Sequence, residues 1–411
     1  MAIDNKDKKV LKSSIEREQN EVACSAECEK IKGSKNLNVP PLRFPEFTEE
    51  WKAEQLDNIA TLSKGIGISK EQLSEDGEPC ILYGELYTKY KSEIIEQVES
   101  KTDINGAKLK RSKANDVIIP CSGETAVDIA TARCVPFDNI LFGGDLNVIS
   151  LHQYDGAFMS YQLNGKRKYD IARVAQGVSI VHLYGEHLKA IKTYNPTLPE
   201  QQKIAKLLSL LDDRIDTQNK IIEDLKKLKS AISERLFKSV KGFTVLLSDL
   251  CDIVKGKQIN GENLSDSGNY YVMNGGTEPS GYYDNYNVEA STISISEGGN
   301  SCGYVQFNTS PFWSGGHCYS IQNIADKVDN MYLYHYLKSN EDAIMKLRIG
   351  SGLPNIQKKD LAMFKIIVPK IEWQIKISTF LSSLERKAEI EERIQNVMQK
   401  QKLYLLQQMF I

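Results

Sequence analysis

The sequence predicts an α+β protein in which two tandem α+β domains are separated by two long antiparallel coiled-coil helices, related by a pseudo-two-fold repeat. Three observations support this fold class. The later part of the chain repeats the earlier part, each copy ends in a long amphipathic helix, and short β-branched and aromatic runs precede each helix. A chain of 411 residues is long enough for two such domains and their connections.

The repeat is ungapped over the tail of each copy. Each residue there lies 173 positions before its counterpart, as Gly177 does before Gly350. Upstream the copies still resemble each other, but the offset changes: Gly65 resembles Gly256, 191 positions later. Each copy therefore has a variable first part followed by a well-matched tail.

The variable parts are expected to contain short strands. Residues 117–119, 140–142 and 293–295 are β-branched or aromatic runs bounded by Gly, Asn and Asp. Pro196 and Pro369 are expected to close the last strand of each copy, with a helix beginning just beyond.

Apolar residues recur every seven positions in both tails, which predicts helices of about 40 residues, or about 60 Å at 1.5 Å per residue. Gln218 and Glu391 interrupt the pattern at equivalent positions. They either set the register of the helix pair or form a wetter layer of the seam. The residues expected to pack the helices on each other or on partners are Ile204, Leu208, Leu211, Ile215, Leu225, Ile232, Ile377, Leu384, Met398 and Leu405.

These patterns divide the chain into five parts. They are a charged and potentially disordered tail (1–39), a first domain (40–198), a central long helix (199–241), a second domain (242–370) and a distal long helix (371–411). The tail lacks the apolar segment of a signal peptide, and the chain has no apolar run long enough to span a membrane. A cytoplasmic protein is therefore expected.

The charge composition is not typical of a nucleic-acid-binding protein. The net charge is −2, and both domains are slightly acidic, with 18 basic and 22 acidic residues in 40–198 and 10 and 13 in 242–370. Any contact with nucleic acid would therefore depend on local basic patches. The eight scattered cysteines indicate reduced thiols, and Cys24 and Cys28 have no second ligand pair that would complete a metal site.

Catalytic motifs are missing from the sequence. There is no G-x-x-x-x-G-K-[ST] phosphate loop, and Asn195–Thr197 begins like a methyltransferase motif but lacks its second proline and aromatic residue. The five histidines show no metal-ligand spacing. We therefore expect no catalytic residue, no metal and no cofactor in this chain.

Binding residues can still be nominated. Basic side chains favour phosphate contacts, amides can read adenine edges, and tyrosines can stack on bases or contact phosphate. The same residues are also explained without a binding role, as charged residues of solvated loops and tyrosines of ordinary turns. The candidates are Lys108, Lys110, Arg111, Lys113, Lys166, Arg167 and Lys168 in the first domain, and Lys255, Lys257, Gln258, Asn260, Tyr282, Tyr283, Asn285 and Tyr286 in the second.

Two segments resemble a known family. Residues 41–47 (PLRFPEF) are similar to the start of type I restriction-modification specificity subunits of Gram-positive bacteria, and residues 199–215 (PEQQKIAKLLSLLDDRI) are similar to their central segment. The resemblance covers residues 40–411. The second copy departs from it, because Glu372–Gln374 replaces the Pro-Glu-Gln step and Arg386–Lys387 replaces Asp-Arg.

The resemblance implies a non-catalytic DNA-specificity subunit. Each domain would be a target-recognition domain for one half of a bipartite, asymmetric site in double-stranded DNA. The helices would set the spacer and dock two modification (methyltransferase) subunits, with restriction subunits in the full complex. S-adenosylmethionine and ATP would be bound by those partners. Two other interpretations remain open: a self-contained DNA methyltransferase or nuclease, and a coiled-coil scaffold that does not bind DNA.

Overall fold

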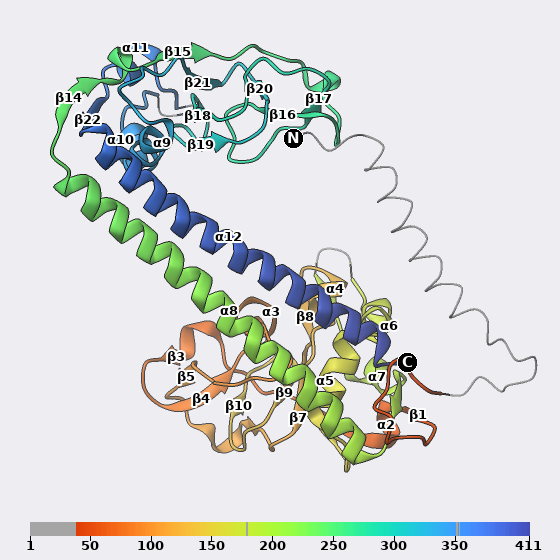
Figure 1. Cartoon of the computed structure of the whole chain (residues 1–411). Coiled ribbons are helices and arrows are strands. Elements are labelled where there is room, and N and C mark those ends of the chain that lie inside the picture. Colours follow the sequence, from red (N-terminus) through yellow and green to blue (C-terminus); the bar gives the residue numbers. More distant parts are fainter. Residues whose placement is uncertain (1–37, 178–179, 351, 353) are drawn as a thin grey trace, which may run out of the picture. The chain divides into compact units, whose positions relative to one another are not determined.

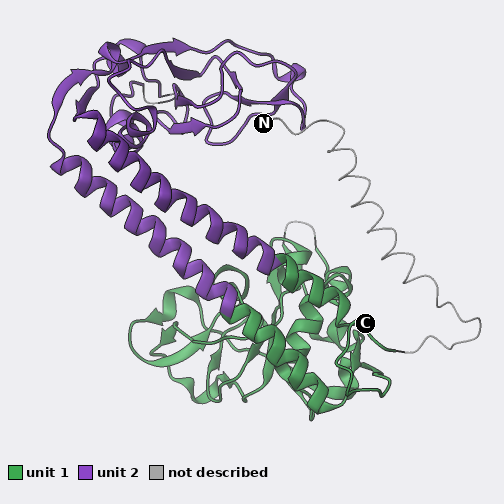
Figure 2. Cartoon of the chain, in the orientation of Figure 1, with its two compact units in different colours: residues 1–213, 400–411 green, residues 214–399 purple. Residues whose placement is uncertain are grey.

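The computed structural model describes residues 38–177, 180–350, 352 and 354–411 (Figure 1). The chain forms two compact units (Figure 2). Unit 1 runs to Asp213 and includes Lys400–Ile411, and unit 2 comprises Arg214–Gln399. Cys24, Cys28 and most of the expected N-terminal tail lie outside the described residues.

Unit 1 is built from short strands and short helices. Its strands are β1 (Lys52–Gln55), β2 (Ala60–Lys64), β3 (Leu73–Ser74), β4 (Glu78–Ile81), β5 (Lys101–Thr102), β6 (Lys110–Arg111), β7 (Asp116–Pro120), β8 (Ser122–Gly123), β9 (Arg133–Val135), β10 (Leu141–Phe142), β11 (Leu146–Leu151), β12 (Val181–His182) and β13 (Lys192–Asn195). Its helices are α2 (Leu56–Ile59), α3 (Glu85–Thr88), α4 (Ala126–Ile129), α5 (Gly156–Asn164), α6 (Lys168–Val174) and α7 (Gly185–Lys189), with 3-10 turns at Lys70–Gln72 and Gly106–Lys108.

The central sheet of unit 1 has the antiparallel order β2-β11-β7-β9. All five residues of β7 are buried, because the strand lies inside the sheet and its two faces contact separate apolar clusters. A second sheet has five strands in the order β3-β5-β4-β10-β6, and β1 pairs with β13.

Unit 2 contains β14 (Phe243–Leu246), β15 (Asp252–Lys255), β16 (Tyr270–Met273), β17 (Tyr282–Tyr283), β18 (Thr292–Ser296), β19 (Val305–Asn308), β20 (Trp313–Ser314), β21 (Cys318–Gln322) and β22 (Lys365–Val368). Its helices are α9 (Asn330–Ser339), α10 (Glu341–Met345) and α11 (Lys358–Ala362), with 3-10 turns at Leu247–Asp249 and Gly261–Asn263.

The sheets of unit 2 repeat those of unit 1. The order β15-β21-β18-β19 matches β2-β11-β7-β9, and the pair β14–β22 matches β1–β13. A parallel pair also recurs, as β4–β10 in unit 1 and β16–β20 in unit 2. The three strands expected from sequence are confirmed as β7, β10 and β18, and the expected closing prolines directly follow β13 and β22.

Two long helices complete the fold, α8 (Leu198–Ser239, 42 residues) and α12 (Ile371–Gln408, 38 residues). Within unit 2 they run antiparallel, since Lys226 contacts Glu392 and Lys229 contacts the earlier Glu385, at 2.6 and 2.5 Å. The expected fold class, tandem α+β domains with long antiparallel helices, is confirmed.

The two polar interruptions of the helix pattern meet each other. Gln218 Nε2 donates to Glu391 Oε2 at 2.7 Å and lies 3.1 Å from the Glu391 carbonyl oxygen. The two residues are counterparts in the repeat, so they lie on the local two-fold axis of this helix pair. Gln218 is buried, and the contact is therefore a paired polar layer inside the seam.

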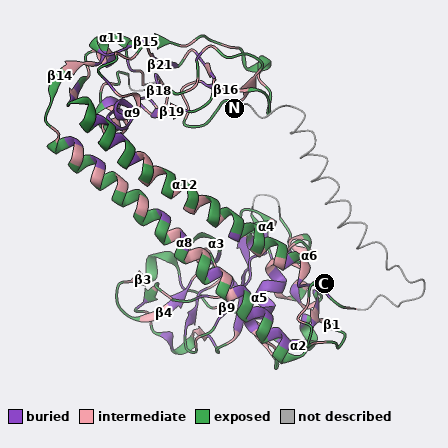
Figure 3. Ribbon diagram, in the orientation of Figure 1, coloured by how far each residue is buried: buried purple, intermediate pink, exposed green. Residues whose placement is uncertain are grey.

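Both long helices have buried positions along their length (Figure 3), and apolar side chains at some of them join the core clusters of the units. In unit 1, Ile204 and Leu208 are buried against a cluster that includes Trp51, Phe158 and Phe410. In unit 2, Ile377 joins the main core cluster. Of the other residues expected to pack, Met398 is buried, whereas Leu211, Ile215, Leu225, Ile232, Leu384 and Leu405 are half-buried.

Candidate nucleic-acid interface

The central sheets of the two units end in equivalent loops. Lys64 ends β2 and Lys255 ends β15, and a glycine follows each lysine. A Cβ on Gly65 would lie 2.0 Å from the Gly143 carbonyl oxygen. A Cβ on Gly256 would lie 2.1 Å from the Gly315 carbonyl oxygen. Glycine is therefore required at both places, because the neighbouring loop approaches the backbone too closely for any side chain.

Backbone hydrogen bonds identify further counterparts at this end of the sheet. The Cys121 amide donates to the Asp145 carbonyl at 2.7 Å, and the Glu297 amide donates to the His317 carbonyl at 2.9 Å. The next segment along the chain also repeats, since the Leu183 amide donates to Cys121 and the Ile356 amide donates to Glu297. Cys121 and Asp145 in unit 1 thus correspond to Glu297 and His317 in unit 2.

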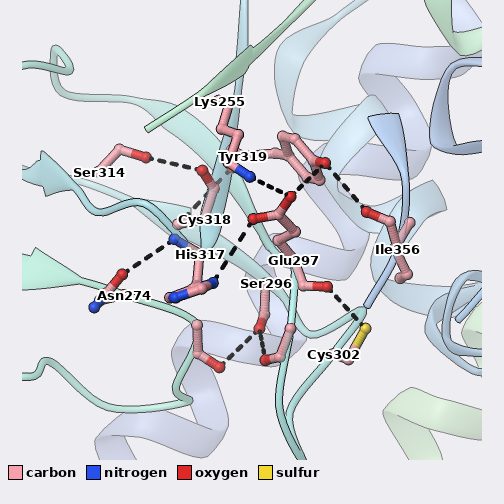
Figure 4. A network of polar contacts seen from close by, with 12 residues as sticks. Lys255, Asn274, Ser296, Glu297, Cys302, Ser314, His317, Cys318, Tyr319 and Ile356 are labelled. Carbon is pink, nitrogen blue, oxygen red and sulfur yellow. Dashed lines mark hydrogen bonds and ion pairs between the residues drawn. The ribbon is translucent and has the colours of Figure 1, made fainter. Parts of the chain in front are cut away.

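Glu297 is the centre of a polar network at the strand ends of unit 2 (Figure 4). It is only 3% exposed. Its Oε1 accepts from Lys255 Nζ at 2.6 Å and lies 2.9 Å from the Tyr319 hydroxyl. His317 Nδ1 lies 3.9 Å from the other carboxylate oxygen, Oε2. The lysine and histidine side chains are 54% and 59% exposed, so a buried carboxylate lies beneath two solvent-facing nitrogen groups.

Burial and the hydrogen bond to Glu297 raise the pKa of Tyr319 well above its usual range. The phenol therefore stays protonated and remains able to donate. Lys255 and Tyr319 both contact the same carboxylate oxygen.

The remaining candidates of unit 2 lie in the adjoining loops. Lys257, Gln258 and Asn260 are exposed on the loop after β15. The indole nitrogen of Trp313 donates to the Lys257 carbonyl at 2.9 Å.

The Tyr283 ring packs edge-on against the same indole at 5.1 Å. Tyr282 and Tyr283 are half-buried in β17, and Asn285 and Tyr286 are exposed just after it. The structure thus links the lysine loop to the tyrosine strand through one tryptophan.

The first basic cluster of unit 1 is divided between exposed and paired side chains. Lys108 and Lys113 are exposed, whereas Lys110 and Arg111 are half-buried in β6. The Arg111 guanidinium forms a two-point ion pair with Glu78, at 2.6 and 3.0 Å. The ion pair therefore neutralises part of the positive charge of this basic cluster within unit 1.

The second basic cluster lies at the junction of α5 and α6. Arg167 donates to the Ile411 carbonyl oxygen at 2.6 Å and pairs with Asp170 at 3.0 Å. Lys168 is half-buried, and burial lowers its pKa. Lys166 alone of the three is exposed. Packing against the end of the chain accounts for the position of Arg167.

Sequence reasoning did not nominate Lys64, Glu297 or His317. The recurrence of Gly65 at Gly256 was a usable signal, because the residue before each glycine is lysine. The part played by Glu297 had no comparable signal, since its partners come from β15, from β21 and from the loop before β21. Among the described residues, no group of three or more potential metal ligands is found, and no described helix is long and apolar enough to cross a membrane.

Comparison with known proteins decides the family. Residues 48–227 and 242–400 both match the type I restriction modification DNA specificity domain. The chain belongs to this family. Its two matched segments include the two sheets described above, so each unit of this type I specificity subunit carries one copy of the domain.

Individual relatives agree with this assignment. The chain is 34% identical over 122 residues to a type I specificity subunit of Mycoplasma genitalium, a match that covers 29% of this chain and 31% of that relative. It is 24% identical over 410 residues to the type I restriction enzyme MjaVIII specificity subunit of Methanocaldococcus jannaschii, covering 88% and 91% of the two chains. The first match thus spans about a third of its relative, and the second spans most of it.

The fold is shared with a solved specificity subunit. The crystal structure of the type I restriction-modification S subunit from M. genitalium superposes with a TM-score of 0.65 at 20% identity. The superposition covers 91% of this chain and 99% of that one. The tandem arrangement of a specificity subunit therefore extends over nearly the whole described chain.

Proposed function

We propose that this specificity subunit reads a bipartite, asymmetric site in double-stranded DNA, with each unit reading one half. The observation that carries the proposal is that both units place the same strand ends and loops but present different side chains there. Both units keep a lysine at the first strand end (Lys64 and Lys255), but unit 1 has Cys121 and Asp145 where unit 2 has Glu297 and His317. Different hydrogen-bonding groups at matched positions suit different base sequences, because base-edge contacts carry the specificity.

The long helices are proposed to dock two modification subunits, with restriction subunits joining the full complex. Support comes from large apolar side chains that remain exposed on them: Leu207, Leu210, Ile221, Leu228, Trp373, Ile375, Phe380, Ile390, Ile394, Val397, Leu403 and Tyr404. Exposed apolar surface of this extent is typical of a protein interface. The partners would carry S-adenosylmethionine and ATP, and this chain would hold no cofactor and perform no catalysis.

A domain exchange tests the proposal directly. Residues 242–370 are replaced by the corresponding segment of another specificity subunit, and methylated adenines are mapped in cells that contain the modification subunit. We expect one half of the recognised site to change and the other to stay the same. A change in both halves would contradict independent reading by the two units.

The same system separates the other interpretations. If the purified chain methylated DNA with S-adenosylmethionine alone, it would be a self-contained methyltransferase. If the chain with its modification subunit failed to retard DNA in a gel, it would act as a scaffold. The first result is not expected, because the catalytic motifs are missing from the sequence. The second is not expected, because both segments of the chain match the type I DNA specificity domain.

The proposal that the helices set the spacer has its own test. Four residues are added after Gln218 and four after Glu391, which contact each other, so that both helices of the pair lengthen together. Each helix grows by about 6 Å at 1.5 Å per residue, and four residues rotate the apolar stripe only slightly. Since DNA rises about 3.4 Å per base pair, the unspecified spacer should grow by one or two base pairs. An active variant with an unchanged spacer would contradict this role.

A further inference from the structure

One carboxylate of unit 2 is buried without a complete set of partners. The Oε1 atom of Glu297 is occupied by Lys255 and Tyr319. The Oε2 atom is buried and has no hydrogen-bond donor among the described residues. Buried carboxylate oxygens are normally paired, because burying a charged acceptor without a donor is unfavourable. The arrangement therefore needs an explanation beyond packing.

The exposed side chain of a histidine lies close to that oxygen. His317 Nδ1 lies 3.9 Å away, which is beyond hydrogen-bond distance but within reach of a small rotation of the ring (Figure 4). The backbone of His317 is fixed, since its amide donates to Asn274 Oδ1 at 3.1 Å. A Cβ on Gly275 would lie 3.1 Å from the histidine Cβ, so the loop beneath the ring is also close-packed. The ring can turn toward Glu297 while its main chain stays in place.

A hydrogen bond from His317 to Glu297 would determine which donor and acceptor atoms Lys255 and His317 present to solvent. Lys255 uses one of its three N–H donors on Glu297 and keeps two for a ligand. A neutral imidazole that donates from Nδ1 becomes an acceptor at Nε2. The pair of side chains then offers a donor beside an acceptor.

The charge balance favours contacts with bases over contacts with phosphates. A lysine paired with a buried carboxylate contributes no net positive charge to the loop, and phosphate attraction depends on net charge. Its free N–H groups still match the O6 and N7 acceptors of guanine, and the imidazole acceptor matches the amino group of adenine or cytosine. This pair of side chains therefore contributes more to sequence selectivity than to affinity for DNA.

We propose that Glu297 is a positioning residue that holds Lys255 and His317 as base-reading side chains of unit 2, with Lys255 selecting a guanine in its half-site. This inference rests on the proposed function. Unit 1 has no corresponding device, because the counterpart of Glu297 is the buried thiol Cys121, whose pKa burial raises to about 11. The two half-sites should therefore differ at the base pair that this position contacts.

The test maps methylated adenines in cells that express the full chain with its modification subunit. In Lys255→Met, preference for guanine should fall roughly tenfold to a hundredfold at one position of one half-site. Glu297→Gln should weaken the preference at that position and at a neighbouring one, because it releases both side chains. His317→Ala should affect the neighbouring position alone. A loss of protein stability alone would lower methylation at all sites without changing the recognised bases.

Three further variants keep the test decisive if Glu297→Gln does not fold. Lys255→Arg retains the ion pair and should keep guanine, whereas Lys255→Gln should shift the preference toward adenine, which an amide can read. Lys238→Met removes another ion-paired, exposed lysine of unit 2 and should leave the recognised site unchanged.

Recognition identical to the unmodified chain in Lys255→Met and Lys255→Gln would overturn the inference while leaving the proposed function intact. If the unmodified chain directed no methylation, the proposed function would fail first.

Discussion

Each unit joins the two long helices through an ion pair and a tyrosine, and the two clusters are counterparts in the repeat. In unit 1, Lys402 Nζ contacts Asp212 at 2.6 Å, and the Tyr161 hydroxyl donates to the same carboxylate at 2.7 Å. A second carboxylate, Glu93, approaches Lys402 at 2.5 Å. We call these four residues the first cluster.

The second cluster, in unit 2, consists of Lys229, Glu385 and Tyr334. The lysine contacts Glu385 at 2.5 Å, and the Tyr334 hydroxyl donates to it at 3.2 Å. The Glu385 side chain is 27% exposed, compared with 7% for Asp212. A lysine, a carboxylate and a tyrosine thus meet at equivalent positions of the repeat, in environments that differ in burial.

The difference in burial determines how strongly each cluster depends on its lysine. Burial raises the pKa of Asp212 in spite of the opposing effect of Lys402. Burial lowers the pKa of Lys402, but the charges of Glu93 and Asp212 outweigh it and raise the pKa overall. One lysine thus serves two buried carboxylates in unit 1, whereas one lysine serves one partly solvated carboxylate in unit 2.

The largest expected effect follows from Lys402→Met. Removing the lysine takes away the cation that both Glu93 and Asp212 contact, and breaking a buried ion pair typically costs about 3–5 kcal/mol in the free energy of unfolding. Denaturant unfolding, with hydrogen exchange to resolve unit 1 from unit 2, measures the loss and shows where it falls. Exchange should accelerate in unit 1.

Lys229→Met is the matched control in unit 2. Because Glu385 keeps access to solvent, we expect a loss of about 1 kcal/mol, in the range of partly exposed pairs. Equal losses for the two variants would show that burial does not distinguish the clusters.

The second prediction concerns acid. Burial lowers the pKa of His335 to about 4, so the folded protein keeps this imidazole neutral below its ordinary value of 6.5. The unfolded chain takes up the proton first, so unit 2 should lose stability as the pH falls from 6.5 toward 4. A shift of this size corresponds to about 3 kcal/mol, since one pKa unit is worth about 1.4 kcal/mol.

The repeat supplies the control for that prediction. The counterpart of His335 in unit 1 is Gln162, which hydrogen-bonds to the backbone of Tyr194 and does not titrate. His335→Gln should therefore flatten the acid dependence of unfolding in unit 2. An unchanged pH profile in this variant would assign the acid sensitivity to other groups.

The smallest expected effect is at the polar layer between the helices. Gln218→Leu leaves Glu391 without its amide partner in a half-buried position, at a cost of about 1 kcal/mol. Adding Glu391→Leu should recover that loss or exceed it, because an apolar layer then replaces the polar one. Thermal unfolding of the single and double variants gives the comparison. If the double variant were less stable than Gln218→Leu, the polar layer would stabilise the protein by more than the contact between Gln218 and Glu391.

The fold could be predicted from sequence to the extent that it depends on local pattern. The seven-residue spacing of apolar residues predicted α8 and α12, and the β-branched runs at 117–119 and 293–295 predicted β7 and β18. The repeat also predicted that the two long helices pair with each other. These features lie close together in the chain or recur at a fixed distance, so no knowledge of tertiary contacts was needed.

The candidate interface was less predictable, because its chemistry depends on distant residues. Arg167 looked like part of a basic cluster, but it contacts Ile411, 244 positions away. Glu297 was not among the candidates, because its partners Lys255 and Tyr319 lie 42 and 22 positions away in the chain. A pattern of charges along the chain cannot show which of them are already paired.

The contact between Gln218 and Glu391 also bears on which helices can associate. Because these residues are counterparts, two copies of α8 paired in the same register would bring one amide against another, and amides can hydrogen-bond to each other. Two copies of α12 would bring two carboxylates together, and like charges at that distance repel. The mixed pair therefore favours association of α12 with α8 over association with its own kind, which biases the chain toward closing on itself during folding.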